Sequence, residues 1–377
     1  MIATGERVHL TRAALVAIAA IFFLMGILGS AYGPLLEHLA RRFDVSLAVA
    51  GGVLTTHFSG ALVGVLTSMR VLQRVSSRAF LLGAVTCLGV GCASVAVAPS
   101  WPAFLASVFV VGIGWGALDI GCNQLVAHSE GVRRTAILNA LNGTFAVGAV
   151  AGPILVSTVG GTHLTLLYGG AAVVAFALWP LVSGVSGRLP FTSSRSADSP
   201  AFLLGIFMIG FALYVGMEAG IGGWMPSHLE SLGLQSVAAA TLTSGFWLAL
   251  AAGRLLAALV PARVLESAIV ITASAVAAVA LVSALIPAAA PVAYIVAGLA
   301  IAPIFPTGIV WLAKLRPGDA RVTSWLFPAS MVGGALIPGG IGALIARFGI
   351  GLAPAILSLV AVGCLAAFSL ARRGQPG

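Results

Sequence analysis

Apolar stretches of about 20 residues, almost free of charged side chains, recur along the whole chain of 377 residues. About 20 helical residues cross a hydrocarbon core of about 30 Å. Barrel strands alternate apolar and polar residues over about ten positions, whereas these stretches are continuously apolar, so we predict helices. The chain is therefore expected to be an all-α polytopic membrane protein with twelve transmembrane helices. The predicted spans are Ala13–Leu36, Leu47–Met69, Ala79–Ala98, Trp101–Ala127, Thr135–Val159, Thr162–Val185, Ala201–Leu229, Val237–Val260, Val264–Ile286, Pro291–Ala313, Val322–Ala346 and Ile350–Ala371.

The composition excludes most soluble classes of protein. Only 8% of the residues are charged, against about 25% in a soluble domain, and the mean hydropathy is +1.10. The four cysteines lie inside apolar runs, which argues against disulfides and metal sites. The sequence contains no GxxxxGK[ST], HExxH or GxSxG motif, so we predict neither an enzyme nor ATP-driven transport, and no cofactor.

The distribution of basic residues predicts the orientation in the membrane. If Met1 is cytoplasmic, 16 of the 19 Lys and Arg residues fall on the cytoplasmic side, and only Arg41, Arg42 and Arg347 fall outside. This bias follows the positive-inside rule with both termini in the cytoplasm. The net charge of +9 therefore reports topology in the inner (plasma) membrane and a lipid environment rather than a nucleic-acid partner.

The two halves of the chain resemble each other. Residues 186–200 are the longest polar interval and predict a cytoplasmic linker between six-helix bundles at residues 1–185 and 201–377. A gapless shift of 186 positions relates spans four and five to spans ten and eleven, and a weaker shift of about 190 relates spans one and two to seven and eight. Two parallel six-span repeats are the architecture of major facilitator transporters. The shifts pair Gly112 with Gly298, Gly148 with Gly334, Ala149 with Ala335, Gly152 with Pro338, and Gly64 with Gly253.

Two acidic residues, Asp119 and Glu218, fall at membrane depth, where an ionisable group costs about 2.5 kcal/mol or more. No Lys or Arg is expected near the centre of any span to neutralise them. Spacing of four places Trp115, Asp119 and Asn123 on one helix face. This column suits the binding of a polyhydroxylated ligand, and the alternative is a protonated structural acid bonded to a neighbouring helix.

Glu218 lies among glycines that weaken its helix and free carbonyl groups to line a cavity. Burial disfavours the charged form of a carboxyl group, so Glu218 is a candidate for carrying a coupling proton. The alternative is an interhelical hydrogen bond. His57, in mid-membrane, is a further candidate for ion coupling or a structural histidine.

Other polar and aromatic residues are weaker candidates for solute binding. Asn139 and Asn142 share a helix face, where amides bind a ligand or tie helices together. Arg254, near the cytoplasmic end of its span, is expected to snorkel or to clasp helix ends in gating rather than to touch the solute. The remaining candidates for solute contact are Tyr214, Trp224 and Trp247.

Several motifs resemble the fucose:proton symporter family, a sugar-transporting branch of the major facilitators, over nearly the whole chain. The resemblance implies that Asp119 stands in the place of the family's sugar-binding acid, Asn142 in that of a polar sugar contact, and Glu218 where the fucose symporter has an amide. The sodium-dependent glucose transporter branch is similar around Glu218 and Gly222-Gly223-Trp224. The motifs are Gly114–Asn123 (GWGALDIGCN), Leu138–Asn142 (LNALN), Gly148-Ala149, Tyr214–Glu218 (YVGME), Gly253-Arg254, Phe305–Thr307 (FPT) and Gly333-Gly334 followed by Pro338.

The chain departs from that family in span one. The family's proton-coupling acid would fall near Gly33, where this sequence reads Ala31-Tyr32-Gly33-Pro34. Coupling would therefore use another group, such as Asp119 or Glu218, or be absent. The loop after span two also lacks the acid of the usual major facilitator motif, which removes that residue as a gating element.

These observations predict an alternating-access transporter that takes up a monosaccharide-like solute with H⁺ or Na⁺ and works as a monomer. A proton-driven exporter of an amphiphilic drug or metabolite is the second hypothesis. A sugar sensor that binds without transport is the third.

Overall fold

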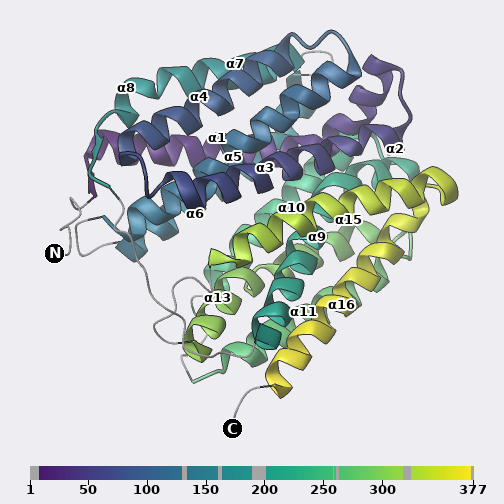
Figure 1. Ribbon diagram of the computed structural model, residues 1–377. Coiled ribbons are helices and arrows are strands. Elements are labelled where there is room, and N and C mark those ends of the chain that lie inside the picture. Colours follow the sequence, from purple (N-terminus) through teal and green to yellow (C-terminus); the bar gives the residue numbers. More distant parts are fainter. Residues whose placement is uncertain are drawn as a thin grey trace. The chain divides into compact units, whose positions relative to one another are not determined.

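The computed structural model describes residues 8–129, 134–159, 164–188, 201–257, 259, 263–316 and 324–374, and within them the chain is almost entirely helical (Figure 1). Twelve helices of this described part are long and apolar enough to cross a membrane. The prediction of an all-α membrane protein with twelve spans is confirmed. The predicted linker lies mostly outside the described residues.

Most helices of the two sequence halves are labelled in Figure 1. In the first half they are α1 (Arg12–Phe43), α2 (Leu47–Ala50), α3 (Gly52–Val71), α4 (Ser77–Ala96), α5 (Trp101–Ala127), α6 (Arg134–Val159), α7 (Leu164–Ala177) and α8 (Trp179–Val182). In the second half they are α9 (Ala201–Ser231), α10 (Ser236–Ala257), α11 (Glu266–Ser283), α12 (Ala290–Ile301), α13 (Ile304–Leu315), α15 (Leu326–Phe348), the 3₁₀ turn η1 (Ile350–Leu352) and α16 (Ala353–Arg373).

Two predicted spans differ from the observed helices in an instructive way. Span ten is interrupted at Ala302 and Pro303, between α12 and α13, because proline has no N–H to donate and disfavours helix in the residue before it. Span one continues to Phe43 as α1, seven residues beyond the predicted end at Leu36.

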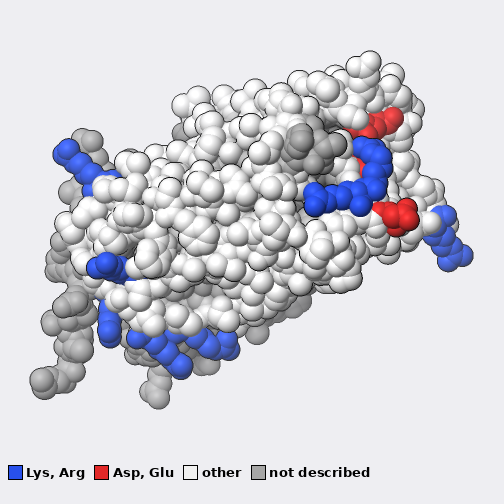
Figure 2. Space-filling model, turned by 90° about the horizontal axis from the view of Figure 1, so that it is seen from above, with Lys and Arg blue, Asp and Glu red and all other residues white. Residues whose placement is uncertain are grey.

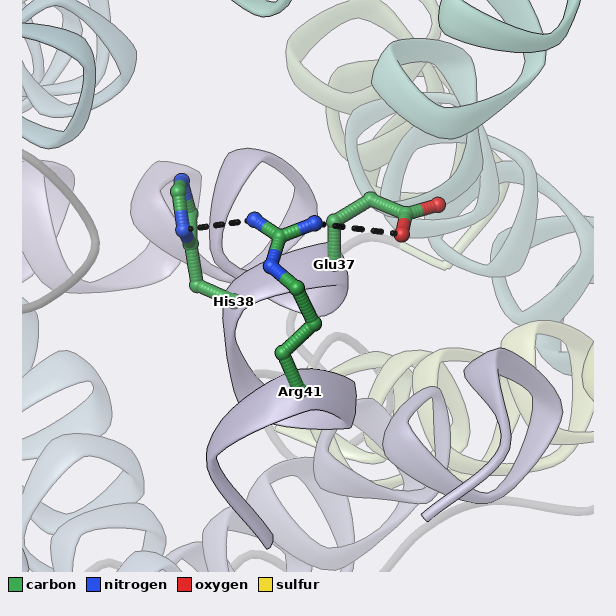
Figure 3. A network of polar contacts seen from close by, with 3 residues as sticks. All are labelled: Glu37, His38 and Arg41. Carbon is green, nitrogen blue, oxygen red and sulfur yellow. Dashed lines mark hydrogen bonds and ion pairs between the residues drawn. The ribbon is translucent and has the colours of Figure 1, made fainter. Parts of the chain in front are cut away.

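Polar residues form the extension of α1. Arg41 lies 3.0 Å from His38 Nδ1 through Nη2, and 3.8 Å from Glu37 Oε2 through Nη1 (Figure 3). Basic side chains in a last turn interact favourably with the negative end of the helix dipole. The continuous apolar run ends at Leu36, whereas the helix continues to Phe43 through residues that these interactions support.

The chain forms two compact units. The first unit comprises Met1–Gly29, Thr56–Gly152 and Thr158–Ser193, and the second comprises Ser30–Thr55, Pro153–Ser157 and Ser194–Gly377. The second unit thus includes the end of α1 and the start of α3 as well as the helices of the second half. This division is distinct from the sequence repeat, and the domain boundaries inferred from the repeat stay a prediction.

Short backbone pairings fasten the N-terminal segment within the first unit. The strand β1 (His9–Leu10) pairs antiparallel with β2 (Val185–Ser186), and Val8 forms a parallel bridge with Ser129. These contacts join the segment before α1 to the segments that follow α5 and α8. The pairings give hydrogen-bond partners to backbone groups that lie outside the helices.

Glycines bring helix backbones into contact in the first unit. Gly112 of α5 lies against the carbonyl group of His57 in α3, and Gly64 of α3 lies against the carbonyl group of Ile113 in α5. A Cβ atom at either glycine would collide with that backbone. Small residues that permit such close approach are typical of helix packing in membranes.

The second unit repeats this contact at corresponding positions. Gly298 of α12 lies against the carbonyl group of Phe246 in α10, and Gly253 of α10 lies against that of Leu299 in α12. These residues follow their first-half counterparts by 186 positions from α5 to α12 and by 189 from α3 to α10. The internal repeat is therefore present in the packing as well as in the sequence.

The packing corrects the predicted alignment of α6 with α15. Gly148 lies against the carbonyl group of Phe23 in α1, and Gly333 lies against that of Ala212 in α9. The shift is 185 rather than 186, so Gly148 corresponds to Gly333 and not to Gly334. It also aligns the prolines within the two helices, Pro153 and Pro338, so the predicted pairing of Gly152 with Pro338 was also wrong by one residue. The interval between spans ten and eleven is one residue shorter than that between spans four and five.

Charged side chains are sparse on the face shown in Figure 2, where they gather toward the two ends and leave an uncharged band between them. An uncharged surface band is what contact with lipid requires, because exposed charge in hydrocarbon is costly.

We expect Gly333→Ala to lower the thermal unfolding temperature of the purified protein in detergent. The added Cβ would collide with the Ala212 carbonyl oxygen and force α9 and α15 apart, and overpacking of this kind costs about 1–3 kcal/mol. Gly340→Ala is the matched control in α15, since a Cβ there would meet no atom within 4 Å. Equal unfolding temperatures for the two variants would contradict the packing described.

Candidate functional site

Asp119 and Asn123 form a polar pair on α5 in the first unit. Asn123 Nδ2 donates hydrogen bonds to the Asp119 carbonyl oxygen at 2.8 Å and to Asp119 Oδ1 at 3.3 Å. Both side chains are half-buried. The spacing of four predicted this shared face, and the structure brings the carboxyl and amide groups together on it.

Trp115, one turn before Asp119, forms an aromatic wall. Its ring lies edge-on to His57 of α3 at 5.6 Å and to Phe145 of α6 at 6.4 Å, and its Nε1 donates to the Met25 carbonyl oxygen at 3.4 Å. Trp115 is half-buried, whereas His57 is only 1% exposed and also packs against Phe58. This environment is that of a packed ring, and an ion-coupling role for His57 stays a prediction.

The two asparagines of α6 differ in what the structure describes. Asn142 is exposed, and its Nδ2 donates to the Leu138 carbonyl oxygen of its own helix at 2.9 Å. The side chain of Asn139 lies outside the described residues. Solute contact by either residue stays a prediction.

Glu218 in the second unit is paired with a cation. Arg254 Nη2 lies 3.8 Å from Glu218 Oε2 and donates a hydrogen bond to the Tyr214 hydroxyl oxygen at 3.5 Å. The expectation that no Lys or Arg would neutralise Glu218 is wrong, and the expected clasping of helix ends by Arg254 in gating stays a prediction. The side chains of Glu218 and Arg254 are 15% and 25% exposed.

Helix geometry explains why the pair was missed. Residues 232–235 join α9 and α10, which pack against each other as antiparallel neighbours. Tyr214 and Arg254 lie at nearly the same distance from this loop, so the two residues are level. The long Arg254 side chain then extends toward Glu218, one turn further along α9, instead of toward the nearer helix end. The spacing of residues within one span does not predict which residues of two neighbouring helices lie at the same height along their axes.

Two phenylalanines complete the surroundings of this cluster and were not predicted as site residues. The rings of Tyr214 and Phe305 lie 5.9 Å apart, and those of Phe305 and Phe327 lie 6.0 Å apart. Under the shifts set by the glycine contacts, Phe305 is the counterpart of Asp119 and Phe327 that of Asn142. The internal repeat is the sequence signal from which these two positions could have been found.

The tryptophans predicted for the cavity serve packing instead. Trp224 is fully buried, its Nε1 donates to the Pro338 carbonyl oxygen at 3.0 Å, and its ring lies against Gly51 and Gly342. The structure thus contradicts a solute-facing Trp224. Trp247 is 7% exposed, and its Nε1 is buried without a hydrogen-bond partner among the described residues.

The two units therefore present different chemistry at corresponding places. The first offers carboxyl, amide and indole groups, which bind hydroxyls by accepting and donating hydrogen bonds and by ring contact. The second offers a guanidinium beside a carboxylate, a phenol and two phenyl rings.

The sequence and the fold of the chain are similar to those of known transporters. The sequence is 24% identical over 369 residues to the sodium-dependent glucose transporter 1A of Mus musculus, covering 85% of this chain and 86% of the relative. It is 25% identical over 345 residues to a gentisate transporter of Corynebacterium glutamicum, covering 84% and 77%. The crystal structure of the major facilitator transporter FucP in the outward conformation superposes with a TM-score of 0.67 at 14% identity, covering 95% of this chain and 98% of that one.

These relatives are transporters, which agrees with the prediction that the protein is not an enzyme. The profile of the Major Facilitator Superfamily matches residues 18–338, the greater part of the chain. The protein is thus a multi-pass membrane transporter of a small-molecule solute, and it belongs to the Major Facilitator Superfamily.

Proposed function

We propose that the protein is a secondary active transporter that takes up a monosaccharide-like solute by alternating access. The observation that carries this proposal is the Asp119–Asn123 pair beside Trp115. A carboxylate accepts hydrogen bonds from sugar hydroxyls, an amide both donates and accepts, and an indole ring covers the apolar face of a sugar ring. The glucose-transporting relative supports the same solute class.

The coupling ion is H⁺ or Na⁺ in this proposal, and Glu218 is the first candidate to carry or sense it, ahead of Asp119 and His57. Glu218 lies within a membrane-spanning helix, and its side chain is partly exposed and only loosely paired with Arg254, at 3.8 Å. We further propose that both termini are cytoplasmic in the plasma membrane and that the protein works as a monomer.

The gentisate-transporting relative adds a second solute class, the hydroxylated organic acids. Gentisate is a dihydroxylated aromatic carboxylate, so it shares hydroxyl groups with a sugar and differs by its negative charge. The observation that favours this class is the presence of Arg254 within the membrane-spanning part of the second unit.

We expect Asp119→Asn to weaken the binding of glucose or fucose by at least tenfold. A hydrogen bond to a charged group contributes about 1.5–3 kcal/mol, and about 1.4 kcal/mol corresponds to tenfold in Kd. Asp44→Asn is a control of the same chemistry, because Asp44 is exposed and has a φ of 52°, a conformation that Asn tolerates. Binding is measured by isothermal titration in detergent. Unchanged sugar affinity in the Asp119 variant would remove Asp119 from the site.

Coupling is tested by uptake of labelled hexoses into proteoliposomes with an inward proton gradient and no sodium. We expect uptake above that of empty vesicles, and its loss on addition of an ionophore. Glu218→Gln should keep exchange of internal for external sugar but lose accumulation, since its side chain no longer takes up or releases a proton. A sodium gradient replaces the proton gradient in the second arm. Absence of uptake in both arms would count against an importer of hexoses.

A further inference from the structure

Arg254 has more hydrogen-bonding capacity than the protein uses. A guanidinium group has five N–H donors in a rigid planar fork. The contacts of Arg254 with Glu218, at 3.8 Å, and with Tyr214, at 3.5 Å, both involve Nη2. Its Nε is buried and has no hydrogen-bond partner among the described residues. Nε is therefore the uncommitted nitrogen of the fork's side edge, and it shares that edge with Nη2, which is released for a second bond when Glu218 moves away.

The loose contact with Glu218 differs from the geometry of a structural ion pair. Arginine and carboxylate groups pair most strongly through two parallel N–H···O bonds of about 2.7–2.9 Å. A charge in this region is expensive and is retained mainly where it has a function. The geometry leaves Arg254 able to form a bidentate contact that Glu218 does not provide.

The surroundings of Arg254 correspond to the proposed solute face of the other unit. Phe305, which packs against Tyr214, is the counterpart of Asp119, and Phe327 is the counterpart of Asn142. Both rings are half-buried, as is the Arg254 side chain. The second unit therefore has two phenyl rings where the first has hydrogen-bonding side chains, and Tyr214 links these rings to the Arg254 cation.

We propose that Arg254 binds the carboxylate group of the transported solute and that Glu218 is the resident anion that this carboxylate displaces. The proposal rests on the proposed function of secondary active transport, and it selects the organic acids, the second solute class given there, over neutral sugars. The solute's carboxylate accepts two parallel bonds from the Arg254 fork, Tyr214 remains within reach as a further donor, and the phenyl rings contact the body of the solute. Sugar acids and hydroxylated aromatic acids share this chemistry.

The test measures binding and uptake of three labelled probes, namely galacturonate, 2,5-dihydroxybenzoate and the neutral sugar glucose. We expect at least one acid to bind the wild-type protein in detergent and to enter proteoliposomes. Arg254→Lys and Arg254→Gln should weaken acid binding by at least tenfold, because neither side chain offers a bidentate fork. The acid that binds identifies which of the two sources of the carboxylate is the solute.

Lys314→Gln is the matched control. It removes the cation of another ion pair of the second unit, in which Lys314 donates to Glu266 at the ends of α13 and α11. The Lys314 side chain is 63% exposed, so its loss should leave acid binding unchanged. A similar loss of binding in the control would attribute the effect to the net charge of the protein and overturn the assignment.

A purely structural role for the pair is separated by the variant Glu218→Gln/Arg254→Gln. Removing both charges together leaves no buried charge uncompensated, whereas removing one partner of the pair does. We expect this variant to fold, as judged by its unfolding temperature, and to lose acid binding, whereas Glu218→Gln alone binds the acid at least as tightly as wild type. Acid binding restored in the double variant would overturn the proposal.

The outcome for glucose separates this inference from the proposed function. Uptake of glucose with no binding or uptake of either acid would overturn the role of Arg254 and leave the monosaccharide proposal in place. Acid uptake without glucose uptake would support Arg254 as the anchor and replace the neutral sugar as the solute.

Discussion

Contact between helix backbones is the interaction on which the rest of this structure depends. Lipid is as apolar as a leucine side chain, so helices in a membrane gain nothing from hiding apolar surface from each other and associate through close packing. In this chain Gly112 and Gly64 let α3 and α5 meet backbone to backbone, and Gly298 and Gly253 do the same for α10 and α12. These contacts fix the level of one helix against the next. That level decides which side chains of neighbouring helices meet, as Glu218 and Arg254 do.

The same contacts distinguish packing positions from chemical ones. Glycines recur at matching places in the two halves because both halves solve the same packing problem. The residues with chemistry break the match, since Asp119 corresponds to Phe305, and Arg254 to Val65. The repeat therefore serves as an internal reference against which functional departures stand out, even without related sequences.

How much the sequence predicts depends on whether a property is local to one helix. Hydropathy placed the twelve spans because length and apolarity act within each segment. Spacing of four placed Asn123 beside Asp119 because both belong to α5. The Glu218–Arg254 pair joins two helices, and its formation depends on their relative level, which no pattern within one span reports. The prediction of a solute-facing Trp224 was wrong for a related reason, because Trp224 is buried by residues that are distant in the sequence.

Asp119 and Glu218 differ in their electrostatic surroundings. Among the described residues Asp119 is bonded to an amide, whereas Glu218 faces the guanidinium of Arg254. Loss of the charge on Asp119 leaves a neutral site. Loss of the charge on Glu218 leaves Arg254 uncompensated where water is scarce, which favours the arrival of another anion.

A proton on Glu218 and a carboxylate on Arg254 therefore favour each other under the proposal for Arg254, and this coupling is reciprocal by thermodynamic linkage. Among the described residues, Tyr214 is a further titratable group in contact with the pair. The titratable side chains of the adjoining helices α12 and α13 are engaged elsewhere, Tyr294 with His228 and Lys314 with Glu266. Under this proposal, protonation of Glu218 removes one negative charge beside Arg254, and the carboxylate of the solute replaces it. Ion and solute are then coupled at a single ion pair, without a chain of further residues between two sites.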